Sequence, residues 1–65
     1  MNIKYFAETD TLYIEFRADE IAESRDLDED TVIDLDTHGN LCAITVEHAS
    51  KRTGIPKFSY EHVAA

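Results

Sequence analysis

The chain has 65 residues, 43% of them hydrophobic, and a formal net charge of −8, a combination that favours one small folded domain over a disordered chain. Twelve of the fourteen acidic residues fall within residues 8–36, where only Arg17 and Arg25 oppose them, so that segment carries a net charge of −10. Such a field excludes nucleic acids and anionic membrane surfaces as partners and favours basic proteins, and no apolar run approaches the roughly 20 residues of a membrane-spanning helix.

The first 27 residues predict a β-hairpin followed by an edge strand. Apolar and polar residues alternate in residues 2–5 and again in residues 11–17, with a polar turn at residues 8–10 between them. Two alternating runs joined by a short turn are typical of an antiparallel hairpin. Residues 21–27 alternate poorly and are rich in charged side chains, which suits an exposed strand at a sheet edge.

A second hairpin gives the clearest local pattern in the sequence. Residues 31–35 and 41–46 are both rich in β-branched and apolar side chains, and the loop between them carries Gly39 near its end. A glycine late in such a loop suits the left-handed residue of a bulged hairpin, because a positive φ costs glycine nothing. Together with the earlier segments, this hairpin predicts a mainly β (α+β) fold, a single antiparallel meander sheet of four to five strands.

One short C-terminal helix is predicted for residues 47–52. Two basic residues would stand in its last turn and Gly54 just beyond it, as is usual where a helix ends. The predicted β-meander domain with its helix therefore spans residues 1–54. Residues 55–65 form a C-terminal tail whose pattern fits either a strand or a brief helix opened by Pro56, and a bound partner is expected to order it.

The potential metal ligands have the wrong spacing for a metal site. The string from Asp34 to Gly39 opens like a calcium-binding loop, but its twelfth residue is Thr45 instead of a glutamate, and both flanks are predicted strands. The three histidines are ten and fourteen residues apart, and Cys42 stands alone in register with apolar neighbours. No metal, cofactor or catalytic residue is predicted, and the chain is expected not to be an enzyme.

The predicted sheet is too large for one short helix to cover. Tyr13 and Val32, together with Tyr5 or Phe6, would add apolar surface to a face that is otherwise solvated. Exposed apolar patches of this kind usually mark an interface, so the chain is expected to form a homodimer or to dock a partner protein through that face. A single cysteine and the absence of a signal peptide predict a cytoplasmic location.

Acidic side chains crowd the turn between the third and fourth predicted strands, where four of residues 26–30 are acidic. Two interpretations remain open for this turn. It is either a solvated acidic tip that keeps the protein soluble or an electrostatic docking surface for a basic protein. Asp34 and Asp36 in the next hairpin would extend such a docking surface.

Several strings along the chain carry a resemblance to a known family. They are residues 3–5, residues 8–16 with Thr11-Leu12-Tyr13-Ile14, residues 21–24, residues 32–36 with Gly39, Leu41 and Ile44, and the closing Ala49-Ser50-Lys51-Arg52. Over about residues 1–52 the chain resembles a bacterial and archaeal family catalogued as domain of unknown function 2283. The resemblance implies a small β-rich domain with no assigned enzymatic activity. Its members resemble small partners encoded beside compact toxin-like proteins.

Charge, patterning and resemblance together predict a small acidic protein-binding module, the antitoxin of a toxin–antitoxin pair that neutralises a basic partner. The alternative is a homodimeric domain that binds a small molecule or a metal between two sheets. Acidic and aromatic side chains would contact the partner, because opposed charge speeds association and aromatic anchors set affinity. These side chains are Tyr13, Asp26, Asp28, Glu29, Asp30, Asp34, Asp36, Phe58 and Tyr60.

Overall fold

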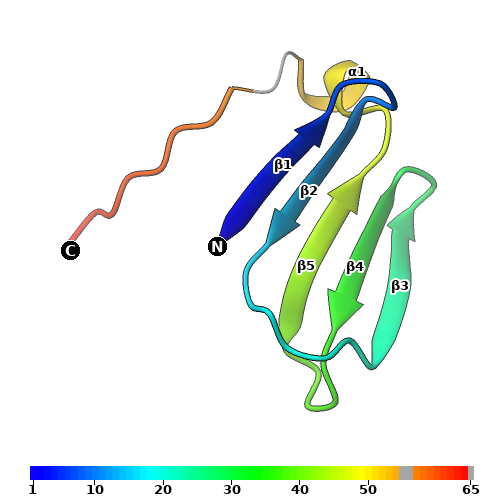
Figure 1. Ribbon diagram of the computed structural model, residues 1–65, viewed down its shortest axis with the longest axis vertical. Helices are drawn as coiled ribbons and strands as arrows, with labels where there is room; N and C mark the ends of the chain where they lie inside the picture. The colour runs from blue at the N-terminus through cyan, green and yellow to red at the C-terminus, as the bar shows by residue number, and fades with distance from the viewer. Residues whose placement is uncertain (55–56, 65) are drawn as a thin grey trace.

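Five antiparallel strands form one open sheet in the computed structural model, which describes residues 1–54 and 57–64 without the side chain of Thr53 (Figure 1). The predicted mainly β fold with one short helix near the C-terminus is confirmed. The elements in chain order are β1 (Asn2–Phe6), β2 (Thr11–Glu15), β3 (Glu23–Asp28), β4 (Thr31–Leu35), β5 (Leu41–Val46) and α1 (Ala49–Thr53).

The strand order is β1-β2-β5-β4-β3, so the meander connectivity holds only for β3, β4 and β5. The β1–β2 hairpin joins the other side of β5 through an antiparallel ladder between β2 and β5. A fully consecutive order would put the charged strand β3 in the middle of the sheet. The observed order instead gives the middle to β5, in which Cys42 and Ala43 are buried, and it confirms the edge position predicted for residues 21–27.

The two faces of the sheet differ in polarity, because residues paired across neighbouring strands point to the same side. One face, the apolar face, carries Ile3, Tyr5, Leu12, Ile14, Ile33, Leu35, Leu41, Ile44 and Val46, with Thr31 and the edge-strand residues Glu23 and Arg25 on the same side. Across its middle runs a row of four directly paired isoleucines, the isoleucine row, made of Ile3, Ile14, Ile44 and Ile33. The opposite, polar face carries Lys4, Tyr13, Glu15, Asp26, Val32, Asp34 and Thr45.

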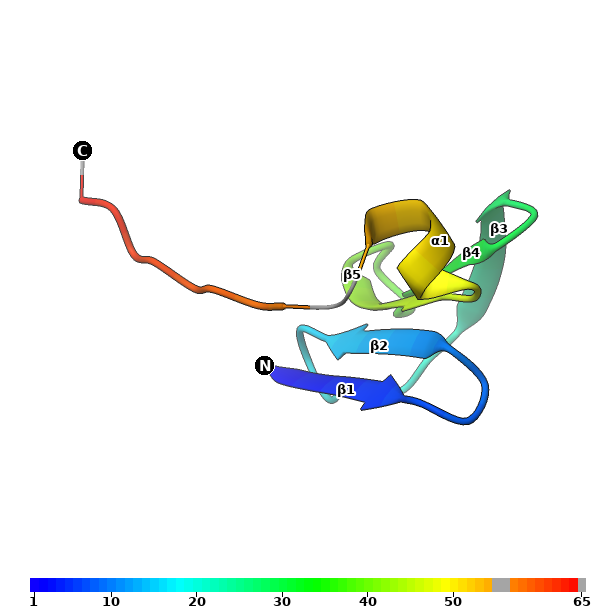
Figure 2. The ribbon, with the colours of Figure 1, turned by 90° about the horizontal axis from the view of Figure 1, so that it is seen from above.

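The buried core is small and lies toward the two ends of the apolar face. Leu12 and Ala49 are buried at the end where α1 packs behind the sheet (Figure 2). At the other end Leu35 is buried, and Cys42 and Ala43 are buried beside a register shift between β4 and β5. There the β2–β3 connection passes close, since Phe16 N–H donates to the Cys42 carbonyl at 2.7 Å. Between the two ends the isoleucine row stays open, with Ile3 41% exposed and its other members half-buried.

Helix α1 is fastened to the β1–β2 turn by Asp10. The Asp10 carboxylate accepts hydrogen bonds from the Ser50 hydroxyl at 2.7 Å and from the Tyr5 hydroxyl at 2.6 Å, and its carbonyl accepts the Ala49 N–H at 2.9 Å. Asp10 has a φ of 54°, a left-handed conformation that aspartate tolerates better than most residues. Gly54, whose φ of 77° is positive and whose ψ is −164°, ends the helix close to the predicted position.

The C-terminal tail, described over residues 57–64, has no regular secondary structure and leads away from the sheet past β1 (Figures 1 and 2). Neither the strand nor the helix expected there is present in the described part, and the helix start expected at Pro56 lies outside the described residues. Within the described ranges, no helix has the length and apolar character needed to cross a membrane.

Candidate functional site

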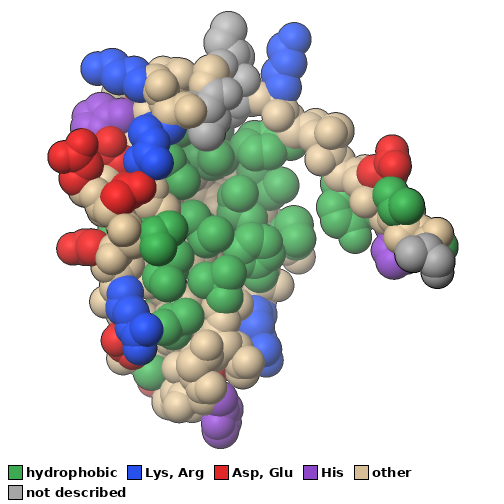
Figure 3. Space-filling model, turned by 180° about the vertical axis from the view of Figure 1, so that it is seen from behind, with side chains coloured by type: hydrophobic (Ala, Val, Ile, Leu, Met, Phe, Trp, Pro, Cys, Tyr) green, Lys and Arg blue, Asp and Glu red, His purple; other side chains and the backbone are tan. Residues whose placement is uncertain are grey.

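The fold leaves the middle of the apolar face without cover. Hydrophobic side chains gather there in one continuous area, with charged side chains at its margins (Figure 3). The edge strand β1 contributes Ile3 and Tyr5, which are 41% and 39% exposed. Helix α1 has five residues and covers only one end, so the isoleucine row remains accessible to another molecule.

The charged groups around the apolar face are joined in ion pairs. The Arg25 guanidinium donates to both Glu23 carboxylate oxygens, at 2.6 and 3.2 Å, on the edge strand β3. Near α1, Arg52 forms a two-pronged bond to Asp28 at 3.1 and 3.0 Å. Each of these pairs cancels its own charge, so the margin of the apolar face is close to neutral despite the net charge of the chain.

The acidic turn between β3 and β4 is tied down to α1. Hydrogen bonds from Arg52, followed by the backbone N–H of Asp30, hold the pKa of the Asp28 carboxyl well below its ordinary value. The Asp30 carboxylate lies 3.0 Å from His48 Nδ1, and the backbone carbonyl of Asp30 accepts the Glu47 N–H at 2.7 Å. Asp28 and Asp30, both predicted to contact a partner, therefore hold the end of the sheet to the helix.

Three other predicted contact residues, Tyr13, Asp26 and Asp34, share the polar face. Tyr13 and Val32 lie in one row there, with Thr45 between them, so the apolar face is on the opposite side of the sheet from Tyr13. Burial, followed by the charge of Glu15, raises the pKa of the Tyr13 hydroxyl.

The aromatic residues of β1 divide between the two faces. Tyr5 belongs to the apolar face, whereas Phe6 is opposite Thr11 on the polar side. Of the two candidates predicted to accompany Tyr13 and Val32, Phe6 is therefore the one that shares their face.

The strands give the polar face a net charge of −2, from three carboxylates against one lysine. The carboxylates are those of Glu15, Asp26 and Asp34, and the lysine is Lys4. Asp34 accepts a hydrogen bond from the Ser24 hydroxyl at 2.6 Å. Asp26 is exposed and makes no ion pair or hydrogen bond of its side chain within the described ranges, so its charge is available to a partner.

Asp36 is also acidic, but it has a structural role. It is 8% exposed, and its carboxylate accepts the backbone N–H groups of His38 and Asn40, each at 2.9 Å, and the Asn40 side-chain amide at 3.0 Å. These bonds, those from Asn40 first, lower the pKa of Asp36. The carboxylate closes the β4–β5 loop around Gly39 and is buried there.

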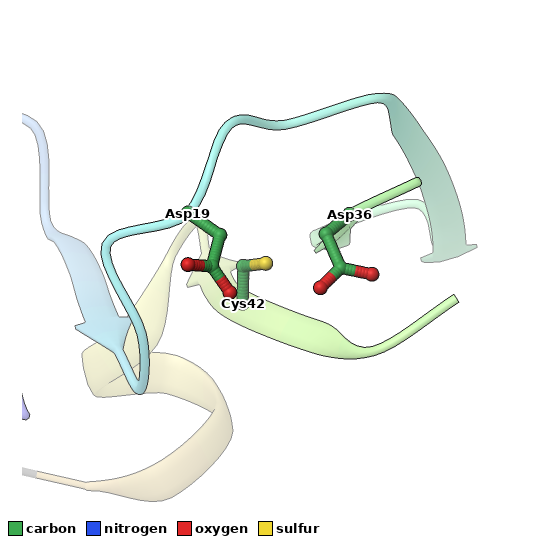
Figure 4. Close-up of side chains that lie close together, drawn as sticks. All are labelled: Asp19, Asp36 and Cys42. Carbon is green, nitrogen blue, oxygen red and sulfur yellow. The ribbon is translucent and has the colours of Figure 1, made fainter. Parts of the chain in front are cut away.

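Asp19, Asp36 and Cys42 form a close group of potential metal ligands that the sequence analysis did not find (Figure 4). Their ligand atoms lie within 4.8 Å of one another, although the residues come from three separate segments with no recognisable spacing. Asp19 is already paired with Arg17 at 2.6 Å. Burial, and then the charges of Asp36 and Asp19, raise the pKa of the Cys42 thiol. A protonated thiol between two occupied carboxylates does not fit a metal, which requires free, deprotonated ligands.

A depression of about 400 Å³ lies at the β1–β2 turn and is lined by residues 5–9. The Tyr5 hydroxyl in its wall is committed to Asp10 at 2.6 Å, and Glu8 supplies its one carboxylate. Small-molecule sites usually bring several polar groups together in an enclosed apolar cavity. The depression therefore does not favour a ligand-binding function.

The remaining predicted contact residues lie at the surface, outside the strands. Glu29 is exposed at the tip of the β3–β4 turn and makes no ion pair or hydrogen bond of its side chain in the part of the chain that the structure describes. Phe58 and Tyr60 stand on the tail, 49% and 79% exposed. The structure thus places Glu29 at the β3–β4 turn and the two aromatics on the C-terminal tail.

Fold and surface together define a small open-sheet β domain with one apolar and one acidic face. The chain belongs to the family described as Protein of unknown function (DUF2283), whose model matches residues 2–50. The match covers all five strands and ends at Ser50, the residue that Asp10 holds. Comparison with curated proteins and with solved structures gave no match.

Proposed function

We propose that this domain is a protein-binding module, and that the open middle of the apolar face is its docking surface. One observation carries the proposal: the isoleucine row crosses four strands and is covered by no other element in the described ranges. Exposed, contiguous apolar surface on a small domain usually marks an interface. A chain of this length also buries too little surface to be robust alone, so covering this face would stabilise it.

A finer part of the proposal concerns a basic partner. Some acidic side chains take no part in ion pairs within the described chain, and they are exposed at the β3–β4 turn and on the polar face. Their negative charge would speed the encounter with a basic protein. This supports the role of an antitoxin that neutralises a basic toxin. The role is non-enzymatic and cytoplasmic, in keeping with a single buried cysteine.

The experiment measures association with the protein encoded beside this one, provided that this neighbour is basic and toxic when expressed alone. The test variant combines Asp26→Asn, Glu29→Gln and Asp34→Asn. The matched control combines Glu8→Gln, Glu20→Gln and Glu61→Gln, three exposed residues whose replacement changes the net charge equally.

The test variant should slow association by about tenfold at low salt and flatten its salt dependence, because these charges attract a basic partner before it docks. The control variant should lose much less. Equal slowing in both variants would show that only total charge matters. A neighbour that neither binds nor is rescued by this chain would refute the antitoxin role.

A further inference from the structure

We propose that the molecule covering the apolar face is a second copy of this chain, packed sheet against sheet. This inference rests on the proposed protein-binding function and names the partner for the same face. Three properties of the face carry it. Its margin is neutral, its middle is a row of identical side chains, and its area together with that of the exposed tail approaches the area of a stable interface.

The distribution of charge favours a copy of the chain over a basic protein at this face. Two ion pairs border it, Glu23–Arg25 at 2.6 Å and Asp28–Arg52 at 3.0 Å. The strand carboxylates without a basic partner point to the opposite side of the sheet.

Two sheets stacked about 10 Å apart would therefore hold their acidic faces outward, separated by more than the Debye length of about 8 Å at physiological salt. A basic protein, in contrast, would find no free carboxylate on the neutral apolar face to attract it. The strand carboxylates Glu15, Asp26 and Asp34, which would oppose self-association on the apolar face, are on the other side of the sheet.

The isoleucine row suits self-complementary packing. In a two-fold symmetric dimer the same patch faces itself, so the row of one copy would cross the row of the other. Stacked sheets cross at about 30°, and β-branched side chains interdigitate well between them. Ile14 and Ile44, directly paired on neighbouring strands, would lie beside the symmetry axis.

The area of the sheet points to a contribution from the C-terminal tail. Five strands about 4.8 Å apart and about five residues long give a flat area of roughly 400 Å². A stable interface buries about 800 Å² on each partner, and α1 already covers one end of this face, so the sheet alone supplies at most about half.

The tail has the reach and composition to supply the rest. Its eight described residues, 57–64, extend to about 26 Å. They leave the domain past β1 on the side where α1 lies (Figure 2) and expose Phe58, Tyr60 and Val63. Since each aromatic side chain can bury 150–250 Å² at most, two of them bring the total near the required area. In the dimer, the tail of each copy would pack on the other.

Sedimentation analysis of the full chain from about 1 to about 500 µM tests the inference, because this range spans weak and moderate dimer affinities. The wild-type chain should form a dimer. Ile3→Lys, on the exposed edge of the apolar face, should raise the dimer Kd at least about tenfold by placing an unpaired charge in the interface. Asn2→Lys is the matched control, since it makes the same charge change one residue away on the polar side of β1. It should leave the Kd nearly unchanged.

The tail is tested by the double variant Phe58→Ser with Tyr60→Ser, which removes no contact within the sheet and so leaves the domain folded. It should weaken the dimer about tenfold. Isotope-filtered NOE spectra of a mixed labelled sample should connect Ile14 and Ile44 methyl groups between copies.

A chain that stays monomeric at about 500 µM would overturn the inference, yet would leave the face open for a different protein, as in the proposed function. A dimer weakened equally by Ile3→Lys and Asn2→Lys would overturn it as well. A dimer that binds no basic partner would support the inference and refute only the antitoxin role.

Discussion

Leu12→Ala tests how much stability this small core provides. Leu12 is 6% exposed, between Tyr5 on β1 and Val46 on β5. The substitution removes three carbon groups, about 2.4 kcal/mol of transfer free energy at about 0.8 kcal/mol each. Because the open face lets neighbours move into the space, the cavity should add little, and we expect a total loss of about 2.5 to 3 kcal/mol.

That loss is large for a domain of this size. A chain of 65 residues has a free energy of unfolding of about 3 to 10 kcal/mol, and its open sheet favours the lower end. Urea unfolding followed by circular dichroism, at low micromolar concentration so that association does not contribute, measures the change. Leu27→Ala is the matched control, since Leu27 is 67% exposed and should lose less than about 0.5 kcal/mol. Equal losses at the two positions, or a loss below about 1 kcal/mol for Leu12→Ala, would refute the assignment of the core.

Three further predictions concern polar contacts. Asp10→Ala should free α1 and so expose the Ser50 amide to rapid hydrogen exchange. Asp10→Asn should have a smaller effect, because asparagine tolerates the left-handed φ at this position. Unchanged exchange of the Ser50 amide would contradict the role of Asp10. Because the pKa of Asp28 is lowered in the folded state, its contribution to stability is present above its unfolded pKa and is lost as pH falls. Acidification from about pH 5 to about pH 2 should therefore destabilise the wild-type chain more than Arg52→Gln, as urea unfolding at each pH would show, and parallel losses would argue against the ion pair. The Cys42 thiol, whose pKa is raised by burial, should react with a thiol reagent far more slowly in the folded chain than in urea, and equal rates would show that it is accessible.

The local pattern of the sequence was enough to find every strand but not their order. Alternation located the two hairpins, and Gly39 indeed has a positive φ of 81° in the second loop. The pairing of β2 with β5 joins residues about 30 positions apart, and a period of two carries no information about which strand lies beside which. The charges on β3 predicted that it lies at an edge of the sheet. The apolar residues of β5 would likewise have favoured a position in the middle, and the two preferences together agree with the observed order.

The faces were harder to assign because β2 is apolar on both sides. Leu12 and Ile14 point one way and Tyr13 the other, so alternation alone left Tyr13 as a candidate for the exposed apolar patch. The cross-strand register shows that the isoleucines align and that Tyr13 lies among carboxylates. The ties from α1 to the sheet, Ser50 to Asp10 and Arg52 to Asp28, span 40 and 24 residues and left no local pattern.

The acidic segment is therefore two sets of residues with different roles. Asp10, Asp28, Asp30 and Asp36 hold turns and the helix, so replacing them would test folding before it tests binding. Asp26 and Glu29, with Asp34 on the same face as Asp26, keep charge at the surface.

If the apolar faces of two copies pack together, these free carboxylates point outward on both sides of the dimer. Each dimer would then offer two equivalent acidic faces, and a basic partner would bind with a stoichiometry of two to two. A complex with one partner per dimer would mean that the partner contacts both copies at once, across the edges of the sheets.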